Sequence, residues 1–149
     1  MTKSLDFDSI DKGTPIDGLS IPALTRVALA RFAGSIDDYN PMHLDDKVAM
    51  AAGKSSVYAP SNLVMAYVGR MVEKLFRRFV TATLRAAHAQ ARLAGDILTC
   101  RGVVIDKRIE NGEHVIDADV WADNQRGETV AKGRVLTVVP LAVVKPEQS

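Results

Sequence analysis

Two side chains with complementary proton chemistry lie close together in residues 31–46, RFAGSIDDYNPMHLDD. Asp38 offers a carboxylate, and five residues later His43 offers an imidazole. Pro41 has a fixed φ and disfavours a helical conformation at Asn40, so the segment is predicted to turn. Such a turn can bring the carboxylate and the imidazole onto one point. Two convergent groups with different proton affinities can hold and deprotonate a water molecule.

The same residue types also build turns that carry no chemistry. Asp and Asn form turns by bonding to nearby backbone groups, and a single histidine in a turn can simply bond to a backbone carbonyl. The spacing of Asp38 and His43 by itself therefore leaves two interpretations open, a catalytic pair or an ordinary turn.

Short helices are predicted on both sides of this turn. A helix over residues 25–32 starts at a capping threonine, and Gly34 suits a left-handed exit from it. A second helix, from about residue 45 to 52, starts at a capping aspartate and ends at Gly53.

A longer helix follows and is the dominant element. Pro60 fits its first turn, and apolar residues recur at three- and four-residue spacing as far as Phe79. The stripe consists of Leu63, Val64, Val68, Met71, Val72, Leu75 and Phe79. Residues 63–68 are apolar on every side and charges gather in the second half, so the helix should be buried at its start and surface toward its end.

The last third of the chain is predicted to form an antiparallel meander. Strands are expected over residues 81–93, 97–109, 114–123 and 129–139, joined by tight turns at Asn111-Gly112 and at residues 124–127. A long apolar helix needs a curved sheet to cover it. The predicted fold class is therefore α+β, with one antiparallel sheet around a central helix.

Length and composition indicate one domain with an ordinary core. The chain has 149 residues, of which 47% are hydrophobic and 25% charged, as is usual for a soluble globular domain. We interpret residues 1–20 as a loose lead-in with room for one short strand, residues 21–140 as the domain, and residues 141–149 as a frayed tail.

Charge and cysteine usage exclude several classes of protein. The net charge is only +1, whereas a nucleic-acid partner needs a basic face. The single cysteine, Cys100, allows neither an internal disulfide nor a thiolate metal cluster. The start, Met1 to Asp8, lacks the apolar core of a signal peptide, and the longest apolar stretch, Leu136 to Val144, is interrupted by Thr137 and Pro140. We expect a soluble cytoplasmic protein with no membrane or nucleic-acid partner.

The segment around Asp38 resembles the hydratase motif of the MaoC-like and (R)-specific enoyl-CoA hydratase family, Ser-Gly-Asp-x-Asn-Pro-x-His. Ser35, Asp38, Asn40, Pro41 and His43 match this motif, while Ile36-Asp37 replaces the usual single glycine. The resemblance extends over residues 24–139. Further matches lie at Asp45 and Ala49, at Ala59 and residues 63–70, at the turn Leu93-Ala-Gly-Asp96, and at the hairpin of residues 124–127.

The resemblance implies a hot-dog fold, in which an antiparallel sheet wraps the helix, and a homodimer with sites near the subunit interface. It implies that Asp38 and His43 hold a water against the β-carbon of an enoyl thioester and assist its addition and proton delivery to the α-carbon. Asn40 would shape the turn at the substrate site. The substrate would be a thioester of coenzyme A or acyl carrier protein. No metal or cofactor is implied, because a thioester whose oxygen is held by donors already acidifies its α-proton.

The chain departs from the family at the start of the long helix. The family usually has Ala-His-Gly-Met there, and this chain has Ala59-Pro60-Ser61-Asn62. Hot-dog thioester sites usually draw an oxyanion donor from this backbone, where the helix dipole favours negative charge. Ser61 keeps an N–H and adds a hydroxyl, Pro60 removes a donor, and Asn62 replaces an apolar residue. We assign Ser61 and Asn62, with Asn40, to substrate binding.

Other reactive residue types are interpreted as structural. His88 is expected on a solvated or partner-facing strand, His114 in the inward row of its strand, and Cys100 as a buried thiol. Trp121 alternates with aspartates and should face outward. Arg77, Arg78 and Arg85 fit solvated positions, with coenzyme A phosphates or a carrier-protein surface as the alternative.

Two other functions compete with a hydratase or dehydratase. A hot-dog thioesterase is disfavoured, because the Asp-x-Asn-Pro-x-His motif belongs to hydratases. A catalytically silent subunit that pairs with an active homologue is suggested by the altered segment Ala59–Asn62, whereas the intact Asp38 and His43 argue against it.

Overall fold

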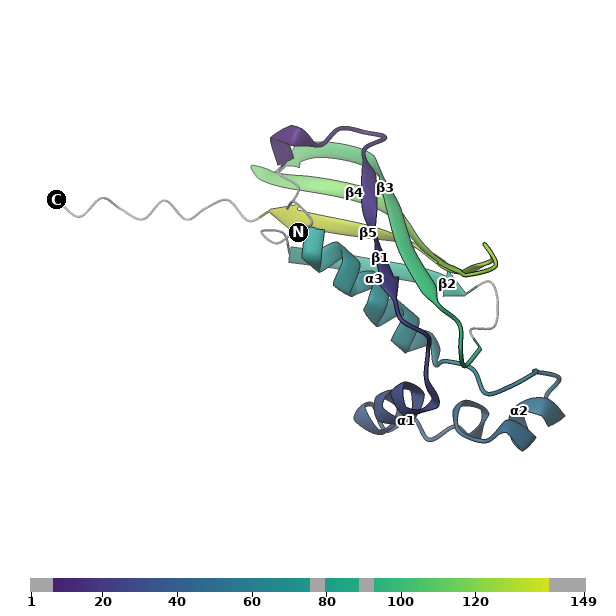
Figure 1. The fold of residues 1–149 in the computed structure, drawn as a ribbon. Coiled ribbons are helices and arrows are strands. Elements are labelled where there is room, and N and C mark those ends of the chain that lie inside the picture. Colours follow the sequence, from purple (N-terminus) through teal and green to yellow (C-terminus); the bar gives the residue numbers. More distant parts are fainter. Residues whose placement is uncertain (1–6, 76–79, 89–92, 140–149) are drawn as a thin grey trace.

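The computed structural model describes residues 7–75, 80–88 and 93–139. Within these residues, one antiparallel sheet of five strands wraps one long helix, α3 (Ser61–Leu75). Two shorter helices, α1 (Arg26–Ser35) and α2 (Asp46–Ala51), lie beyond one end of α3 (Figure 1). The predicted α+β class, with an antiparallel sheet around a central helix, is confirmed.

The sheet is built from β1 (Pro15–Ile21), β2 (Val80–His88), β3 (Leu98–Glu110), β4 (Glu113–Asn124) and β5 (Thr129–Val139). Its strand order is β1-β3-β4-β5-β2, and every neighbouring pair is antiparallel. Asn111 and Gly112, with φ of 52° and 80°, form the predicted tight turn between β3 and β4. These residue types tolerate positive φ, which the two-residue hairpin requires.

The core lies between α3 and one face of the sheet. Val64, Val68 and Val72 of α3 are at most 3% exposed, as their four-residue spacing predicts. Alternate residues of β4 turn toward the helix, and those from Ile116 to Ala122 are also buried. The helix begins at Ser61, one residue later than expected, and its expected extension to Phe79 lies outside the described residues.

Residues 7–21 belong to the fold, so the predicted boundary at residue 21 was too late. The short 3-10 helix η1 (Phe7–Ser9) packs on the sheet, where Phe7 stacks on His114 with ring centroids 4.0 Å apart. Ile10 and Ile16 are 0% and 2% exposed. This correction applies to residues 7–20, the described part of the predicted lead-in. The predicted tail, residues 141–149, lies outside the described residues.

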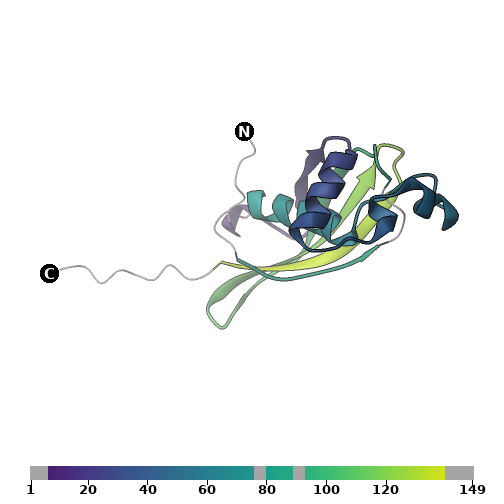
Figure 2. The same cartoon turned by 90° about the horizontal axis from the view of Figure 1, so that it is seen from below.

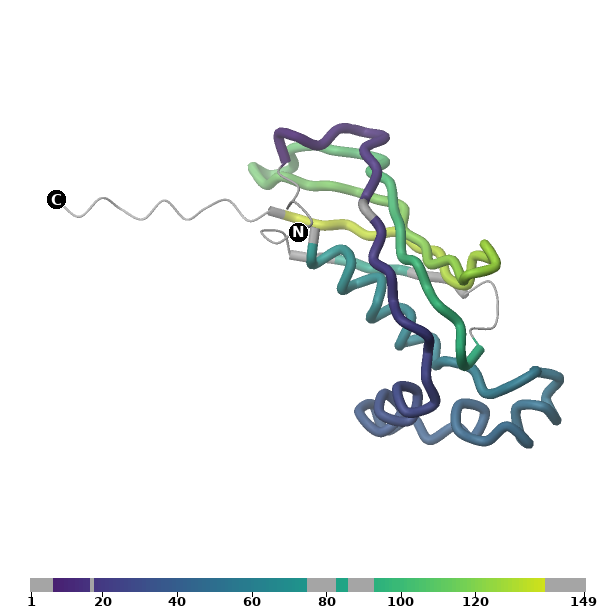
Figure 3. The backbone as a smooth tube through the Cα atoms, viewed as in Figure 1, coloured from purple at the N-terminus to yellow at the C-terminus, as the bar shows by residue number. Residues whose placement is uncertain are grey.

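The two short helices interrupt the path from the sheet to the central helix. Between β1 and α3 the chain forms α1, the 3-10 helix η2 (Pro41–His43) and α2 (Figures 2 and 3). We call this segment, residues 25–56, the excursion. Both predicted caps are confirmed, because Thr25 accepts from the N–H of Ala28 at 3.1 Å and Asp45 from that of Lys47 at 2.8 Å.

Cys100 is fully buried in β3, as predicted. Burial raises the pKa of its thiol to about 11, with a smaller contribution from the nearby Asp123 carboxylate. The thiolate is the reactive form of cysteine. Cys100 is therefore a structural residue of the core.

We expect Cys100 to resist a water-soluble disulfide reagent at pH 8 in the folded protein and to react fully in denaturant. Because the folded pKa is raised above the ordinary value of 9.0, the thiol stabilises the fold below that pH. This contribution to the free energy of unfolding decreases as pH rises from 9.0 to about 11. Cys100→Ala should not show this decrease in stability. Rapid labelling of the native protein would contradict the burial.

Candidate active site

Asp38 is placed by the left-handed end of α1. Asp37 has a φ of 57°, and the N–H of Asp38 donates to the carbonyl of Ala33 at 2.9 Å. This backbone bond is the signature of a Schellman helix end. The predicted exit at Gly34 was wrong, since Gly34 lies within α1 and the left-handed residue comes three positions later. Aspartate tolerates this conformation better than most residues.

His43 is placed by the turn that Asn40 and Pro41 form. The side-chain oxygen of Asn40 accepts from the N–H of Met42 at 3.0 Å, and its carbonyl accepts from the N–H of His43 at 3.0 Å. Pro41 opens η2, where no N–H is needed. The turn therefore presents a largely buried imidazole, because His43 is only 7% exposed.

The structure brings the two predicted catalytic side chains together. Nε2 of His43 lies 3.7 Å from Oδ2 of Asp38, and the side chains are 8% and 34% exposed. This distance is too long for a direct hydrogen bond. A water oxygen can, however, lie about 2.8 Å from both atoms at once. The pair is thus open to solvent on the Asp38 side and enclosed on the His43 side.

The other ring nitrogen of His43 fixes its orientation. Nδ1 lies 2.7 Å from the carbonyl oxygen of Tyr58. A carbonyl can only accept, so this hydrogen bond requires the proton on Nδ1. The neutral ring then presents the lone pair of Nε2 toward Asp38. Imidazole and carboxylate are both acceptors in this state, which suits the two hydrogens of one water molecule.

Tyr58 is a site residue that the sequence did not reveal. Besides its carbonyl bond to His43, its ring packs edge-on against the imidazole, with centroids 5.0 Å apart and an interplanar angle of 85°. Its N–H donates to the carbonyl of Met42 at 3.4 Å. Two of these three contacts use backbone atoms, which every residue carries, so no sequence signal could have identified them.

Asp46 fastens the two ends of the excursion to each other. Its Oδ1 accepts from the N–H of Val57 at 3.0 Å and from Ser56 at 3.1 Å, and its Oδ2 lies 2.6 Å from Arg26. The hydrogen bond from the backbone N–H of Val57 is the main reason that the pKa of Asp46 lies below its usual range, and the bond from Arg26 lowers it further. These bonds fix the residue that precedes Tyr58.

Of the remaining predicted site residues, Asn40 lies in this turn, and Ser61 and Asn62 lie at the start of α3. Asn40 is exposed, and its amide oxygen is used in the turn itself. Ser61 is half-buried and Asn62 exposed at the first two positions of α3, a few residues after Tyr58. Along the chain, α3 begins shortly after Tyr58, whose carbonyl contacts His43.

Within the described residues, the other histidines and Arg85 lie on strands of the sheet and not in the excursion. His114 stacks on Phe7, and His88 ends β2 opposite Ala131. Arg85 is exposed on β2. The predictions for Arg77 and Arg78 fall outside the described residues.

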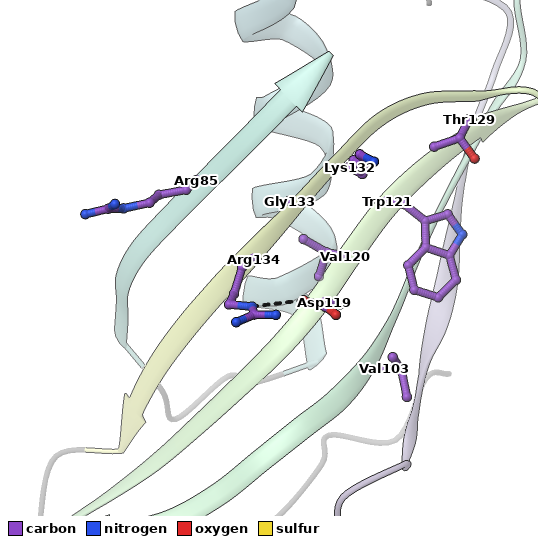
Figure 4. Close-up of a pocket in the computed structure, with 9 residues that line it drawn as sticks. All are labelled: Arg85, Val103, Asp119, Val120, Trp121, Thr129, Lys132, Gly133 and Arg134. Carbon is purple, nitrogen blue, oxygen red and sulfur yellow. Dashed lines mark hydrogen bonds and ion pairs between the residues drawn. The ribbon is translucent and has the colours of Figure 1, made fainter. Parts of the chain in front are cut away.

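A large hollow of the described residues lies elsewhere, on the sheet face turned away from α3 (Figure 4). Its volume is about 800 Å³, and Trp121 faces it, which confirms the outward position predicted for this residue. Among its described lining residues, the one carboxylate, Asp119, is bound by Arg134 at 3.0 Å, and none is a histidine or cysteine. Its described lining therefore offers no acid–base pair comparable to Asp38 and His43.

In the part of the chain that the structure describes, no three His, Cys, Asp or Glu side chains gather as a metal site would require. None of the described helices has the length and apolar character of a membrane span.

An antiparallel sheet wrapped around a central helix defines the hot-dog class of folds, and solved structures of that class share this architecture. The MaoC-like dehydratase from Rhodospirillum rubrum superposes with a TM-score of 0.81 at 21% identity, over 93% of this chain and 100% of that one. The (R)-hydratase from A. caviae superposes with a TM-score of 0.78 at 17% identity, over 89% and 98%.

The family model of the FAS1-like dehydratase domain region matches residues 11–133. The chain therefore belongs to this family, which confirms the resemblance to MaoC-like hot-dog proteins seen around Asp38. A UPF0336 protein from Thermobifida fusca (strain YX) is 29% identical over 125 residues, or 78% of this chain and 82% of that protein. A 3R-hydroxyacyl-ACP dehydratase complex from Mycobacterium tuberculosis also superposes, with a TM-score of 0.72 at 19% identity over 85% of this chain and 96% of that one.

Proposed function

We propose that the protein adds water reversibly to a 2-enoyl thioester and so forms, or dehydrates, a 3-hydroxyacyl thioester. The observation that carries this proposal is the convergence of Nε2 of His43 and Oδ2 of Asp38 at 3.7 Å. His43 is held by Tyr58 in the state that leaves Nε2 free to accept. Family membership and the hydratases among the structural neighbours support the same chemistry.

In the hydration direction, Asp38 and His43 orient one water against the β-carbon of the enoyl group. The water oxygen forms the new C–O bond as one water proton passes to the pair. The electrons of the C=C bond move toward the α-carbon and the thioester oxygen, which becomes an enolate. The α-carbon then takes one proton from the pair, so the pair ends in its starting state. Dehydration follows the same steps in reverse.

The developing enolate oxygen needs hydrogen-bond donors, and the start of α3 is the element to supply them. The start of a helix carries partial positive charge from the helix dipole, which favours a developing negative charge. Pro60 has no N–H, so Ser61 and Asn62 are the first residues of this end with donors. Asn40 acts by holding the turn that presents His43.

The proposal is tested with a panel of enoyl thioesters. Purified protein is incubated with crotonyl-, octenoyl- and bulkier enoyl-coenzyme A, and loss of the conjugated double bond is followed by absorbance. We expect hydration of at least one of them, with the thioester intact. Release of free thiol without hydration would instead indicate a thioesterase. Turnover of none by the pure protein, together with turnover after addition of an active homologue, would indicate a silent subunit.

We also expect a homodimer at micromolar concentration. The sheet ends in two edge strands, β1 and β2, and exposed edges of this kind are usually covered by another chain or element. Light scattering should give a mass near twice 16.1 kDa. A stable monomer would contradict this expectation while leaving the fold of the chain unaffected.

A further inference from the structure

Asp96 is a buried carboxylate that the proposed chemistry does not use. It is 2% exposed and is the last residue of a turn that starts at Leu93. Its Oδ2 accepts from the N–H of Leu93 at 2.9 Å, and its Oδ1 accepts from Gln125 at 3.1 Å and from Arg126 at 3.0 Å. A buried carboxylate is tolerated only with such partners. Asp96 therefore closes its own turn and fastens it to the hairpin between β4 and β5.

This turn, residues 93–96, holds both ends of the excursion. On the incoming side, the N–H of Leu24 donates to the carbonyl of Asp96 at 2.9 Å. The N–H of Gly95 donates to the carbonyl of Leu24 at 2.8 Å. On the outgoing side, the N–H of Ala94 donates to the carbonyl of Val57 at 2.9 Å. Figure 3 shows the chain leaving β1 and returning toward α3 beside the start of β3. The segment that carries Asp38 and His43 is thus anchored on one turn.

The outgoing contact reaches the imidazole directly. Tyr58 forms an antiparallel bridge with Leu93, the first residue of the turn. The carbonyl of Tyr58 in turn accepts from Nδ1 of His43 at 2.7 Å. Three consecutive contacts therefore join the Asp96 carboxylate to the ring: its bond to the N–H of Leu93, the bridge to Tyr58, and the bond to Nδ1.

We propose that Asp96 is a positioning residue for His43. Its carboxylate fixes the 93–96 turn, the turn fixes the carbonyl of Tyr58, and that carbonyl keeps the proton of the neutral imidazole on Nδ1. Nε2 then faces Asp38 as an acceptor. The inference rests on the proposed function for its consequence on catalysis, but the control of the His43 tautomer does not depend on any substrate. Asp96 acts on the ring only through these contacts.

A control at a second carboxylate separates positioning from a general loss of stability. Asp123 is also a shielded carboxylate with three partners, namely Arg101 at 3.1 Å, Trp121 at 3.1 Å and Thr129 at 2.8 Å, and its side chain is 15% exposed. It faces the other side of the sheet, and none of these partners contacts His43. Asp96→Ala and Asp123→Asn should both lower the melting temperature, but only the first should change His43.

The experiment is nitrogen-15 NMR of the imidazoles in the full-length protein at a pH where they are neutral, with His43 assigned through His43→Gln. We expect the Nδ1–H tautomer at His43 in the parent and in Asp123→Asn, and a mixture of tautomers in Asp96→Ala. If Asp96→Ala does not fold, Asp96→Asn, which keeps an acceptor for Leu93, should show the same change to a smaller extent. An unchanged tautomer in the folded Asp96 variant, or a parent without the Nδ1–H tautomer, would overturn the proposal.

The catalytic consequence is measured separately with whichever enoyl thioester the parent hydrates. Misplacement of a reacting group by a fraction of an ångström to one ångström lowers rates by about 10- to 100-fold. We expect kcat of the Asp96 variant to fall about 10-fold with little change in KM, and Asp123→Asn to keep the parent kcat. Equal kcat values for both variants would overturn the positioning role. A parent that hydrates nothing would overturn the proposed function alone, because the tautomer result stands without substrate.

Discussion

Asp38→Asn and His43→Gln should each lower kcat for hydration by at least about 10²-fold, the lower range of general acid–base catalysis. Asparagine keeps the size of Asp38 but removes its charge, and glutamine keeps an amide but cannot exchange a proton near neutral pH. Asp38 contributes one bond to the turn, because its Oδ1 accepts from the N–H of Asn40 at 3.3 Å, and the amide oxygen of asparagine can accept the same bond. The rest of the turn is formed by Asn40 and Pro41. Both variants should therefore fold.

Asp37→Asn is the matched control for these variants. Asp37 is the neighbouring exposed carboxylate, and asparagine also tolerates its positive φ of 57°. We expect this variant to keep the parent kcat within about twofold, because it leaves both hydrogen-bonding atoms of the proposed site unchanged. A comparable loss of activity in Asp37→Asn would mean that the excursion tolerates no change of charge, and that Asp38 has no special role.

Val68→Asp should unfold the protein or lower its stability by several kcal/mol, because it places an unpaired charge in the core. Val68 is 3% exposed at the centre of α3, where it faces the sheet. The free energy of unfolding is measured by urea titration. Ala66→Asp, which adds the same charge to the exposed side of the same helix, should change stability far less. If Val68→Asp melts like the parent, the placement of α3 in the core is wrong.

The local parts of the site could be predicted from the sequence because their signals are local. Caps at Thr25 and Asp45, the turn at Asn40 and Pro41, and the alternation of β4 each depend on residues a few positions apart. The convergence of Asp38 and His43 follows from the same turn. These features are confirmed by the structure, whereas their catalytic use remains a proposal.

The long-range parts could not be predicted, and each has a physical reason. Residues 7–21 gave a weak strand signal, because β1 contains Gly18 and an irregular register between Ile16 and Leu19. The contact between Phe7 and His114 joins residues far apart in the sequence. The left-handed position of Asp37 after α1 was missed, because glycine is the commoner residue in that conformation and Gly34 comes earlier in the sequence.

The supports of His43 were missed for another reason. The carbonyl of Tyr58 is a backbone group and leaves no mark in the sequence. The turn at Leu93–Asp96 was predicted as a turn, but its bonds to Gln125 and Arg126 cross about thirty residues and depend on the completed sheet. The residues that we propose to act, Asp38 and His43, could thus be predicted from the sequence, while the residues that hold them in place follow from the fold.

The most direct test of the central claim, that Asp38 and His43 act on one water, is the kcat of the double variant Asp38→Asn/His43→Gln. Groups that act as a unit are not additive, because removing either already removes the function they share. We predict that the double variant is within about threefold of the poorer single variant. All four proteins must show the native melting transition for the comparison to count. A double variant whose loss equals the product of the two single losses would show that the groups act independently, and would contradict the shared water.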